Sequence, residues 1–345
     1  MKSRDEIKIY ISSFEVLLDK VNVEKVSAND YCKKYLAHLI LHKKYYLLIY
    51  ADVLQKVLNY SGKAKEEIVL LDFGAGNGLM GIFAKSCGFK KVYINDIDPS
   101  FLIAAEALSR EIKIDVDGFI GGDAENVKDY FKGEELDAIA GTDVIEHIYD
   151  LDVFFSNLKQ INPQLVSVFT TASNPENIFK TRALKKLQIK DENEGYFPSE
   201  NNILGGEIHE PFIKMRQKII ELNFKTLSAK EVLMISTNTR GLIERDIKLA
   251  VENYLATGIM PGPPNHPTNT CHPISGSWTE RILPLKNYYS LYKRHGFGLK
   301  VYNGFYNTDK AILKKILGFV LNTAIKIFKY KISPFIFLVG YPSRE

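Results

Sequence analysis

Residues 69–98, VLLDFGAGNGLMGIFAKSCGFKKVYINDID, constrain the fold more than any other segment of this 345-residue chain. An apolar run, Val69–Leu71, ends in Asp72 and is followed by three closely spaced glycines. A helix-like stretch comes next, and a second apolar run, Val92–Ile94, leads to Asp96. This order predicts a strand, a tight glycine turn, a helix and a parallel strand with a carboxylate at its tip.

Such a unit typically holds an adenosine-containing cofactor, and two cofactors fit its pattern. Residues 76–81 satisfy G-x-G-x-x-G, the dinucleotide pattern, in which a helix N-terminus faces a pyrophosphate. The other interpretation begins at Asp72, whose acidic side chain suits a cofactor with a cationic amino group and no phosphate. Asp96 lies where either cofactor needs a carboxylate for its ribose, so this residue does not discriminate. A glycine turn without a ligand is the third alternative.

The segments that follow distinguish these alternatives. Residues 119–125, FIGGDAE, predict the end of a third strand with an acidic tip. Leu136–Thr142 predicts a fourth strand, and DVIEH follows it at 143–147. An amphipathic stretch, Leu151–Ile161, precedes a fifth predicted strand, Val166–Thr171. Dinucleotide dehydrogenases have no reason to carry DVIEH after the fourth strand.

In this order and spacing, the four segments resemble the class I S-adenosylmethionine-dependent methyltransferases over about residues 65–175. The resemblance implies an α/β fold: a doubly wound, Rossmann-like sheet of seven mostly parallel strands, with an N-terminal helical segment and a large insertion after strand five. It also implies S-adenosyl-L-methionine as the cofactor. The implied contacts are Asp72, Gly74, Gly76 and Gly78 at the methionine end, Asp96 and Asp98 at the ribose, Asp123 and Ala124 at the adenine, and Thr142 and Asp143 on the methionine side.

Length and composition agree with an enzyme made of a core and additions. The chain exceeds one typical domain, and its 46% hydrophobic and 25% charged residues are ordinary globular values. The net charge of +4 is small and scattered, so we expect no nucleic-acid partner. Three widely spaced cysteines give no disulfide framework, and the polar start MKSRDEIKIY has no secretion signal, so the expected location is cytoplasmic.

We divide the chain into four segments. An N-terminal helical segment (1–62) precedes the cofactor-binding core (63–172). An insertion (173–283) is the expected substrate-binding cap, and 284–345 returns to the core with strands six and seven. Within the first segment, Tyr31–Leu58 has helical periodicity; a substrate lid and a helix packed on the sheet are the alternatives.

The C-terminal segment predicts three core elements and one ambiguous helix. Lys286–His295 predicts a helix, and Leu299–Phe305 and Ile332–Tyr341 predict strands. The resemblance implies that the last strand runs antiparallel. Between the strands, Asp309–Lys331 is helical in pattern with a basic edge. Peripheral contact with an anionic membrane through 309–331 is one interpretation; a cover for the sheet or a dimer partner is the other. No apolar run here reaches the ~20 residues of a spanning helix.

Two histidines are the candidate catalytic residues. His209 follows a glycine pair and precedes a predicted helix, Phe212–Leu222, in the insertion. Similar methyltransferases of the quinone-biosynthesis type carry G-x-H-[DE] here, close to the acceptor. His147 follows strand four and is either a base or a residue that orients the loop. His266, Cys271 and His272 form H-x4-C-H, which has no standard zinc spacing, so we expect no metal.

The acceptor is an expectation by analogy with surface-polysaccharide methyltransferases. We expect transfer of a methyl group to a hydroxyl of a small metabolite or glycan unit. The alternatives are a C- or N-methyltransferase acting on a lipid-like or quinone-like molecule, and a catalytically inactive binding protein that keeps the cofactor fold. The sequence leaves the oligomeric state open.

Overall fold

The computed structural model describes residues 5–196, 208–309 and 312–343. The chain divides into two compact units, and the second contains the expected insertion together with four residues that follow the fourth strand. The first unit comprises Met1–Ile145, Asp150–Ala172 and Pro284–Glu345, and the second comprises Glu146–Tyr149 and Ser173–Leu283.

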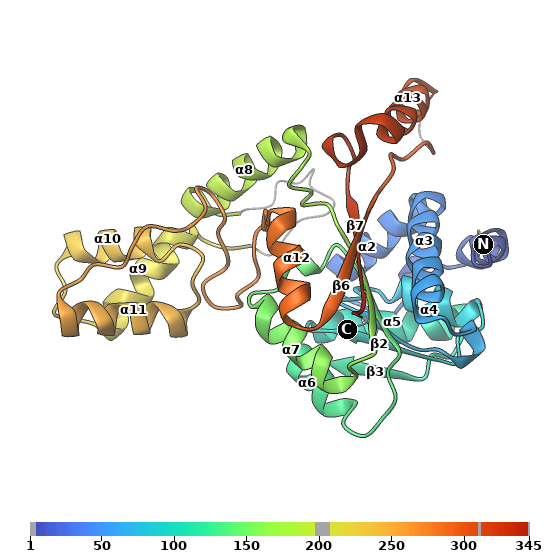
Figure 1. The fold of residues 1–345 in the computed structure, drawn as a ribbon, viewed down its shortest axis with the longest axis horizontal. Helices are drawn as coiled ribbons and strands as arrows, with labels where there is room; N and C mark the ends of the chain where they lie inside the picture. Colours follow the sequence, from blue (N-terminus) through green and yellow to red (C-terminus); the bar gives the residue numbers. More distant parts are fainter. Residues whose placement is uncertain (1–4, 197–207, 310–311, 344–345) are drawn as a thin grey trace. The chain divides into compact units, whose positions relative to one another are not determined.

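Among the described residues, the first unit contains seven strands: β1 (Val69–Phe73), β2 (Lys91–Asp96), β3 (Gly118–Gly121), β4 (Ala138–Thr142), β5 (Val166–Thr171), β6 (Phe297–Asn303) and β7 (Ile336–Pro342). They form one sheet in the order β3-β2-β1-β4-β5-β7-β6. Figure 1 labels β2, β3, β6 and β7 of this sheet. Only β7 runs antiparallel to its neighbours, β5 and β6. Strands β1 and β5 are buried along their whole length, as central strands of a parallel sheet are. The predicted doubly wound, Rossmann-like sheet is confirmed.

Helices surround this sheet in the first unit. Their bounds are α1 (Ile11–Leu18), α2 (Asp30–Leu41), α3 (Lys43–Ser61), α4 (Leu79–Ser86), α5 (Pro99–Ile112), α6 (Ala124–Tyr130), α7 (Leu151–Ile161), α12 (Leu285–Arg294) and α13 (Ile312–Phe328). Single turns of 3-10 helix are η1 (Lys8–Tyr10), η2 (Val23–Lys25), η3 (Lys65–Glu67), η4 (Ile145–His147) and η5 (Lys329–Lys331).

The helix boundaries follow from local capping. Asp98 caps α5 by accepting a hydrogen bond from the Ser100 amide at 2.8 Å, and Pro99 occupies the first helical position. Asp150 caps α7 in the same way. Gly62 ends α3 with a φ of 68°, a left-handed conformation that glycine adopts without strain.

The expected continuous helix over Tyr31–Leu58 is two helices, because the chain breaks at His42. This residue leaves the helical region, with φ −109° and ψ 22°, and it ends α2 and precedes α3. The apolar spacing stays nearly in phase across the break, so periodicity alone does not reveal it.

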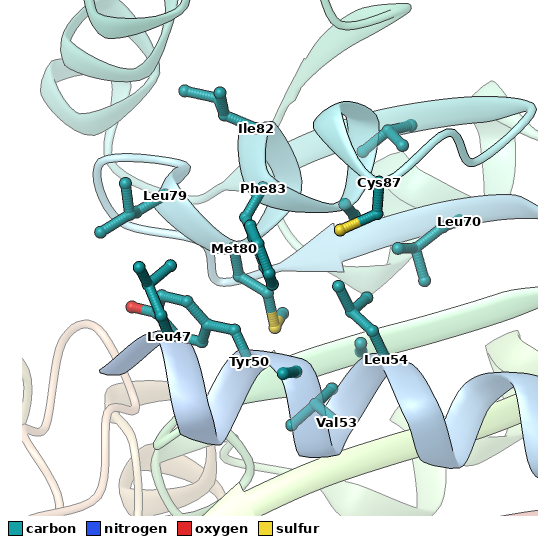
Figure 2. Packing of buried hydrophobic residues seen from close by; sticks show 14 of the residues in the cluster. Leu47, Tyr50, Val53, Leu54, Leu70, Leu79, Met80, Ile82, Phe83 and Cys87 are labelled. Atoms are coloured by element: carbon teal, nitrogen blue, oxygen red, sulfur yellow. The ribbon is translucent and has the colours of Figure 1, made fainter. Parts of the chain in front are cut away.

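The hydrophobic core of the first unit lies between α3, α4 and the sheet. Figure 2 shows Leu47, Tyr50, Val53 and Leu54 of α3 beside Met80 and Phe83 of α4. All six side chains are buried and belong to one cluster that includes residues of β1, β4 and β5. The helix α3 is therefore packed on the sheet, which is the second of the two alternatives for this segment.

The second unit is helical in its described part. Its helices are α8 (Ile178–Asn193), α9 (Phe212–Asn223), α10 (Ala229–Asn238) and α11 (Glu244–Thr257). They enclose a small core of Ile220, Ile235, Ile247 and Val251. The helix expected over Phe212–Leu222 corresponds to α9, whereas α10 and α11 were not predicted.

Candidate functional site

The glycine turn lies at the point where the strand order reverses. The chain moves outward from β1 to β2 and β3 on one side, and from β4 to β5 on the other. Ligands of open α/β sheets bind outside the carboxyl ends of the strands at such a point. Here these ends carry the turn after β1 and the residues Asp143–Val144 after β4. The candidate cofactor site is therefore within the first unit.

Three left-handed glycines shape the turn. The φ angles of Gly74, Gly76 and Gly78 are 62°, 55° and 70°. A Cβ on Gly76 would lie 3.3 Å from the Tyr35 ring, so a side chain at this position would crowd that ring. A Cβ on Gly78 would lie 2.8 Å from Ala105, so this glycine allows close packing of α4 instead.

Protein carboxylates and carbonyls accept hydrogen bonds from the amides of this turn. Asp96 Oδ2 accepts from the Gly76 amide at 2.8 Å, and Asp72 Oδ2 accepts from the Gly81 amide at 2.7 Å. The Gly78 amide donates to the Ala75 carbonyl at 3.0 Å. A pyrophosphate needs such amides unpaired and is repelled by the two carboxylates. The turn therefore suits a cationic ligand better than a dinucleotide.

Asp72 is a buried acid without a basic partner in the described part of the chain. Burial raises the pKa of Asp72 to about 7; the Gly81 amide lowers this pKa and the charge on Asp96 raises it. A cationic amino group beside this carboxyl would favour its ionised form. Asp72 is thus suited to the amino-acid end of S-adenosylmethionine.

The second carboxylate, Asp96, retains hydrogen-bonding capacity at the tip of β2. Its Oδ1 accepts from the Asp98 amide at 2.9 Å and its Oδ2 from the Gly76 amide at 2.8 Å, and the Ile97 amide is a third backbone donor to it. A carboxylate has about four acceptor positions, so capacity remains for a ribose hydroxyl. Burial raises its pKa as well. Asp98 caps α5, Asp123 caps α6, and Ala124 is the first residue of α6.

At the end of β4, Thr142 is paired with Thr170 of β5, and Asp143 has a left-handed φ of 51°. The Asp143 carboxylate accepts a hydrogen bond from the Ala172 amide at 3.1 Å. This carboxylate faces a cluster of tyrosines from α2 and α3, and its charge helps to raise their pKa values. The cluster comprises Tyr35, Tyr45, Tyr46 and Tyr50, with burial as the larger cause of each shift.

Two residues beside the turn were not predicted from the sequence as site residues. Tyr35 borders Gly76, and its ring packs edge-on against Phe101 at 5.8 Å. Asn77 is fully buried; its amide donates to the Cys32 carbonyl at 3.1 Å, while its Oδ1 has no hydrogen-bond partner among the described residues. Periodicity assigns Tyr35 to a helix face and does not connect it with the turn. A polar residue between two glycines was the available signal for Asn77.

Both candidate catalytic histidines lie in the second unit. His147 Nδ1 donates to the Trp278 carbonyl at 2.7 Å, so its Nε2 is the nitrogen that can accept a proton. The Trp278 ring stacks on Tyr149 at 6.1 Å, and the guanidinium of Arg281 lies 4.4 Å from the Trp278 ring. These contacts give His147 a fixed orientation within its own unit.

His209 lies beside a carboxylate and on an aromatic ring. Its Nε2 is 4.0 Å from Asp191 Oδ2, and its ring stacks on Phe212 at 4.3 Å. Thr279 donates to Asp191 Oδ2 at 2.9 Å, and burial raises the pKa of Asp191. His209 Nδ1 donates to the Glu210 carbonyl at 2.9 Å, so its Nε2, which faces Asp191, is the nitrogen that can accept a proton. Gly205, Gly206 and Glu207, which lead to His209 in the sequence, lie outside the described residues.

Comparisons with known proteins agree with this site. Residues 71–162 match the family model described as a methyltransferase domain. A curated relative, the ribosomal protein L11 methyltransferase of Acinetobacter baumannii, is 34% identical over 84 residues, which are 24% of this chain and 27% of the relative. The chain therefore matches only about a quarter of the length of this relative.

Two solved structures show how distant the structural likenesses are. An S-adenosylmethionine-dependent methyltransferase from Archaeoglobus fulgidus has a TM-score of 0.39 at 13% identity, over 88% of this chain and 99% of that one. Magnesium protoporphyrin IX methyltransferase from Synechocystis PCC 6803, with bound S-adenosylhomocysteine, has a TM-score of 0.39 at 13% identity, over 87% of this chain and 86% of that one.

The matched segment includes most of β1, the glycine turn and β2 to β4. The chain therefore carries a class I methyltransferase domain, and S-adenosyl-L-methionine is its cofactor. The residues present fit this cofactor, because the turn supplies two carboxylates and an unpaired buried acceptor to a ligand that carries an ammonium group and ribose hydroxyls.

Proposed function

We propose that this protein, with its class I methyltransferase domain, transfers a methyl group from S-adenosylmethionine to a hydroxyl of a small metabolite or glycan unit. S-adenosylmethionine supplies a methyl group on a positively charged sulfonium. The observation that carries the proposal is the pair of buried carboxylates, Asp72 and Asp96, which have no ion-pair partner among the described residues. They would hold the ammonium and the ribose, and the tyrosine cluster would exclude water.

A hydroxyl acceptor has a chemical requirement that other acceptors need not share. A hydroxyl must lose its proton near the transition state, so a positioned base accelerates the reaction. We propose His209, with Asp191 beside it, as this base, and His147 as the second candidate. A cytoplasmic setting belongs to the same proposal, because Cys32, Cys87 and Cys271 are all free and buried thiols.

A lipid-like or quinone-like acceptor is the second candidate, and a groove of the first unit favours it. This groove, of about 390 Å³, is lined by Tyr45 and Leu48 of α3, Phe305, and Phe319 of α13 among others. Tyr45, Leu48, Phe305, Tyr306 and Phe319 give the groove an apolar part, beside polar residues such as Lys44, Asp309 and Lys326. Tyr45 is also one of the tyrosines that face Asp143. An apolar acceptor would contact the aromatic part of this groove.

Calorimetric titration tests the cofactor first. We expect the wild-type chain to bind S-adenosylmethionine and Asp96→Ala to bind it at least about tenfold more weakly, because the ribose would lose a charged hydrogen-bond partner. The matched control is Asp117→Ala, a carboxylate in the first unit that pairs with Lys85 at 2.6 Å. Binding of NADH in preference to S-adenosylmethionine would overturn the proposal.

Methyl transfer from radiolabelled S-adenosylmethionine then tests the acceptor. Label in a polar, hydroxyl-bearing pool of metabolites and glycans supports the hydroxyl proposal, and label in the organic extract supports the lipid-like alternative. Tight cofactor binding without transfer to either pool would indicate a binding protein that has lost catalysis.

A further inference from the structure

The helix α13 presents an apolar face that lies open in the described part of the first unit. Leu313 is 80% exposed, Ile312 75% and Ile327 74%. Ile316, Leu317 and Val320 are each more than half exposed. At about 100° per residue, these six positions occupy one arc of about 140° on the helix. Contiguous exposed apolar surface of this kind marks a docking site.

The opposite side of α13 is packed against the rest of the first unit. Gly318 and Ile325 are buried, and a Cβ on Gly318 would lie 2.9 Å from the Asn307 carbonyl. Asn322 accepts a hydrogen bond from the Tyr306 amide at 2.7 Å and donates to the Tyr306 carbonyl at 3.0 Å. The helix is thereby held by one stripe of its surface, and the apolar arc points away from that stripe. In Figure 1, α13 lies beyond the ends of β6 and β7, to which it is connected.

Lysines border the arc on both sides. By helical spacing Lys314 lies beyond one edge, and Lys315 and Lys326 lie beyond the other. Lys329 and Lys331 follow in η5, and residues 312–331 contain no acidic side chain. Long lysine side chains can lie along apolar surface while their ammonium groups reach a polar boundary. Apolar residues in the centre with cations at the borders form the surface of an interfacial helix.

We propose that α13 docks the protein on an anionic lipid surface. Its apolar arc would enter the boundary between headgroups and acyl chains, and its lysines would contact lipid phosphates. Charge favours lipid over a second copy of this chain, since a symmetric pair of these helices would bring like charges together. No helix in the described ranges is long and apolar enough to cross a bilayer, so the expected mode is attachment to one surface.

Vesicle flotation of the full chain tests this proposal. The probes are phosphatidylcholine vesicles with and without phosphatidylglycerol. We expect the protein to float with the anionic vesicles and to stay at the bottom with the neutral ones. Added salt should weaken the binding, because it screens the lysines.

Paired variants separate the apolar and the charged contributions. Leu313→Glu with Val320→Glu should reduce vesicle partition more than about tenfold, because two exposed apolar side chains are lost from the arc. Lys314→Glu with Lys315→Glu should also reduce flotation with anionic vesicles, because it reverses two charges that would contact lipid phosphates. The controls are Ile103→Glu with Val153→Glu, two apolar positions on α5 and α7 that are each 55% exposed, and Lys20→Glu; both should float as wild type does.

Three outcomes would overturn the proposal. They are no flotation of the wild type with either vesicle, equal loss in the control variants, and self-association of the wild type that Leu313→Glu with Val320→Glu abolishes while vesicles bind neither. The last outcome would assign the arc to a dimer. Cofactor titration of each variant reports that the first unit is folded. Because flotation requires no methyl transfer, failure of docking leaves the proposed enzymatic function standing.

Discussion

Two buried carboxylates, one in each unit, differ in how they are paired. In the first unit, Asp72 accepts one backbone hydrogen bond at the glycine turn and has no cation beside it in the described chain, so burial raises its pKa to about 7. In the second unit, Glu192 forms a buried ion pair with Arg216, and Thr270 donates to it at 2.8 Å. A buried acid that is paired with a cation has a structural role. A buried acid that lacks a cation is prepared for a cationic ligand.

The largest effect is expected from breaking the ion pair between Glu192 and Arg216. Arg216→Met should destabilise the second unit by about 3–5 kcal/mol, because it leaves the charge of Glu192 buried and unpaired. Lys218→Met is the control, since its pair with Glu210 is exposed and worth at most about 1 kcal/mol. Chemical denaturation measures both. Equal stabilities for the two variants would show that the Arg216 pair has no special structural role.

The next largest effect is expected from distorting the glycine turn in the first unit. Gly74→Ala would force a left-handed alanine whose Cβ clashes with Val144, and it should weaken S-adenosylmethionine binding more than about 100-fold. Gly62→Ala is matched in φ, at 68°, and has open space around the new Cβ. It should lower stability slightly and leave cofactor affinity unchanged. If calorimetry gave both variants the same affinity, the shape of the turn would not determine binding.

A smaller effect is expected from the proposed base. His209→Ala should lower turnover about 100-fold without changing S-adenosylmethionine affinity, because general bases contribute at least this factor. His266→Ala is the control within the same unit, since its ring accepts hydrogen bonds from the Thr268 and Asn269 amides. Turnover in His209→Ala that equals wild type would remove this residue from the mechanism.

The smallest effect is expected from the titration of Asp72. Because its folded pKa lies well above the ordinary value of 3.8, the unliganded protein should lose stability as pH rises from about 4 to 7. Affinity for S-adenosylmethionine should increase about tenfold over pH 6 to 7.5, because the carboxyl becomes ionised. Asp96 and Tyr50 are its titratable neighbours. Asp72→Asn should flatten both profiles, and persistence of either slope would assign the titration to another group.

Much of the first unit could be predicted because its signals are local. The strands β1 and β2, the turn between them and the carboxylates at their tips lie within 30 consecutive residues. The antiparallel β7 was predicted only through the resemblance. The break at His42 was missed, since one non-helical residue does not interrupt the apolar spacing.

The second unit was predicted less well. Helices α10 and α11 were not predicted, although their apolar periodicity is as strong as that of α9, which was. Their starts are nevertheless local: Ser228 and Glu231 form a capping box at α10. The capping signal was present in the sequence and was overlooked.

The sequence by itself determined the cofactor end of this protein. Its three glycines and two carboxylates lie within 30 consecutive residues, on two neighbouring parallel strands and the turn between them. Only the tertiary structure decided which groups are paired. It placed Tyr35 beside Gly76, Asp191 beside His209 and Arg216 beside Glu192, contacts that join distant segments. It also decided that the apolar side of α13 stays open, because burial depends on what the rest of the chain packs against.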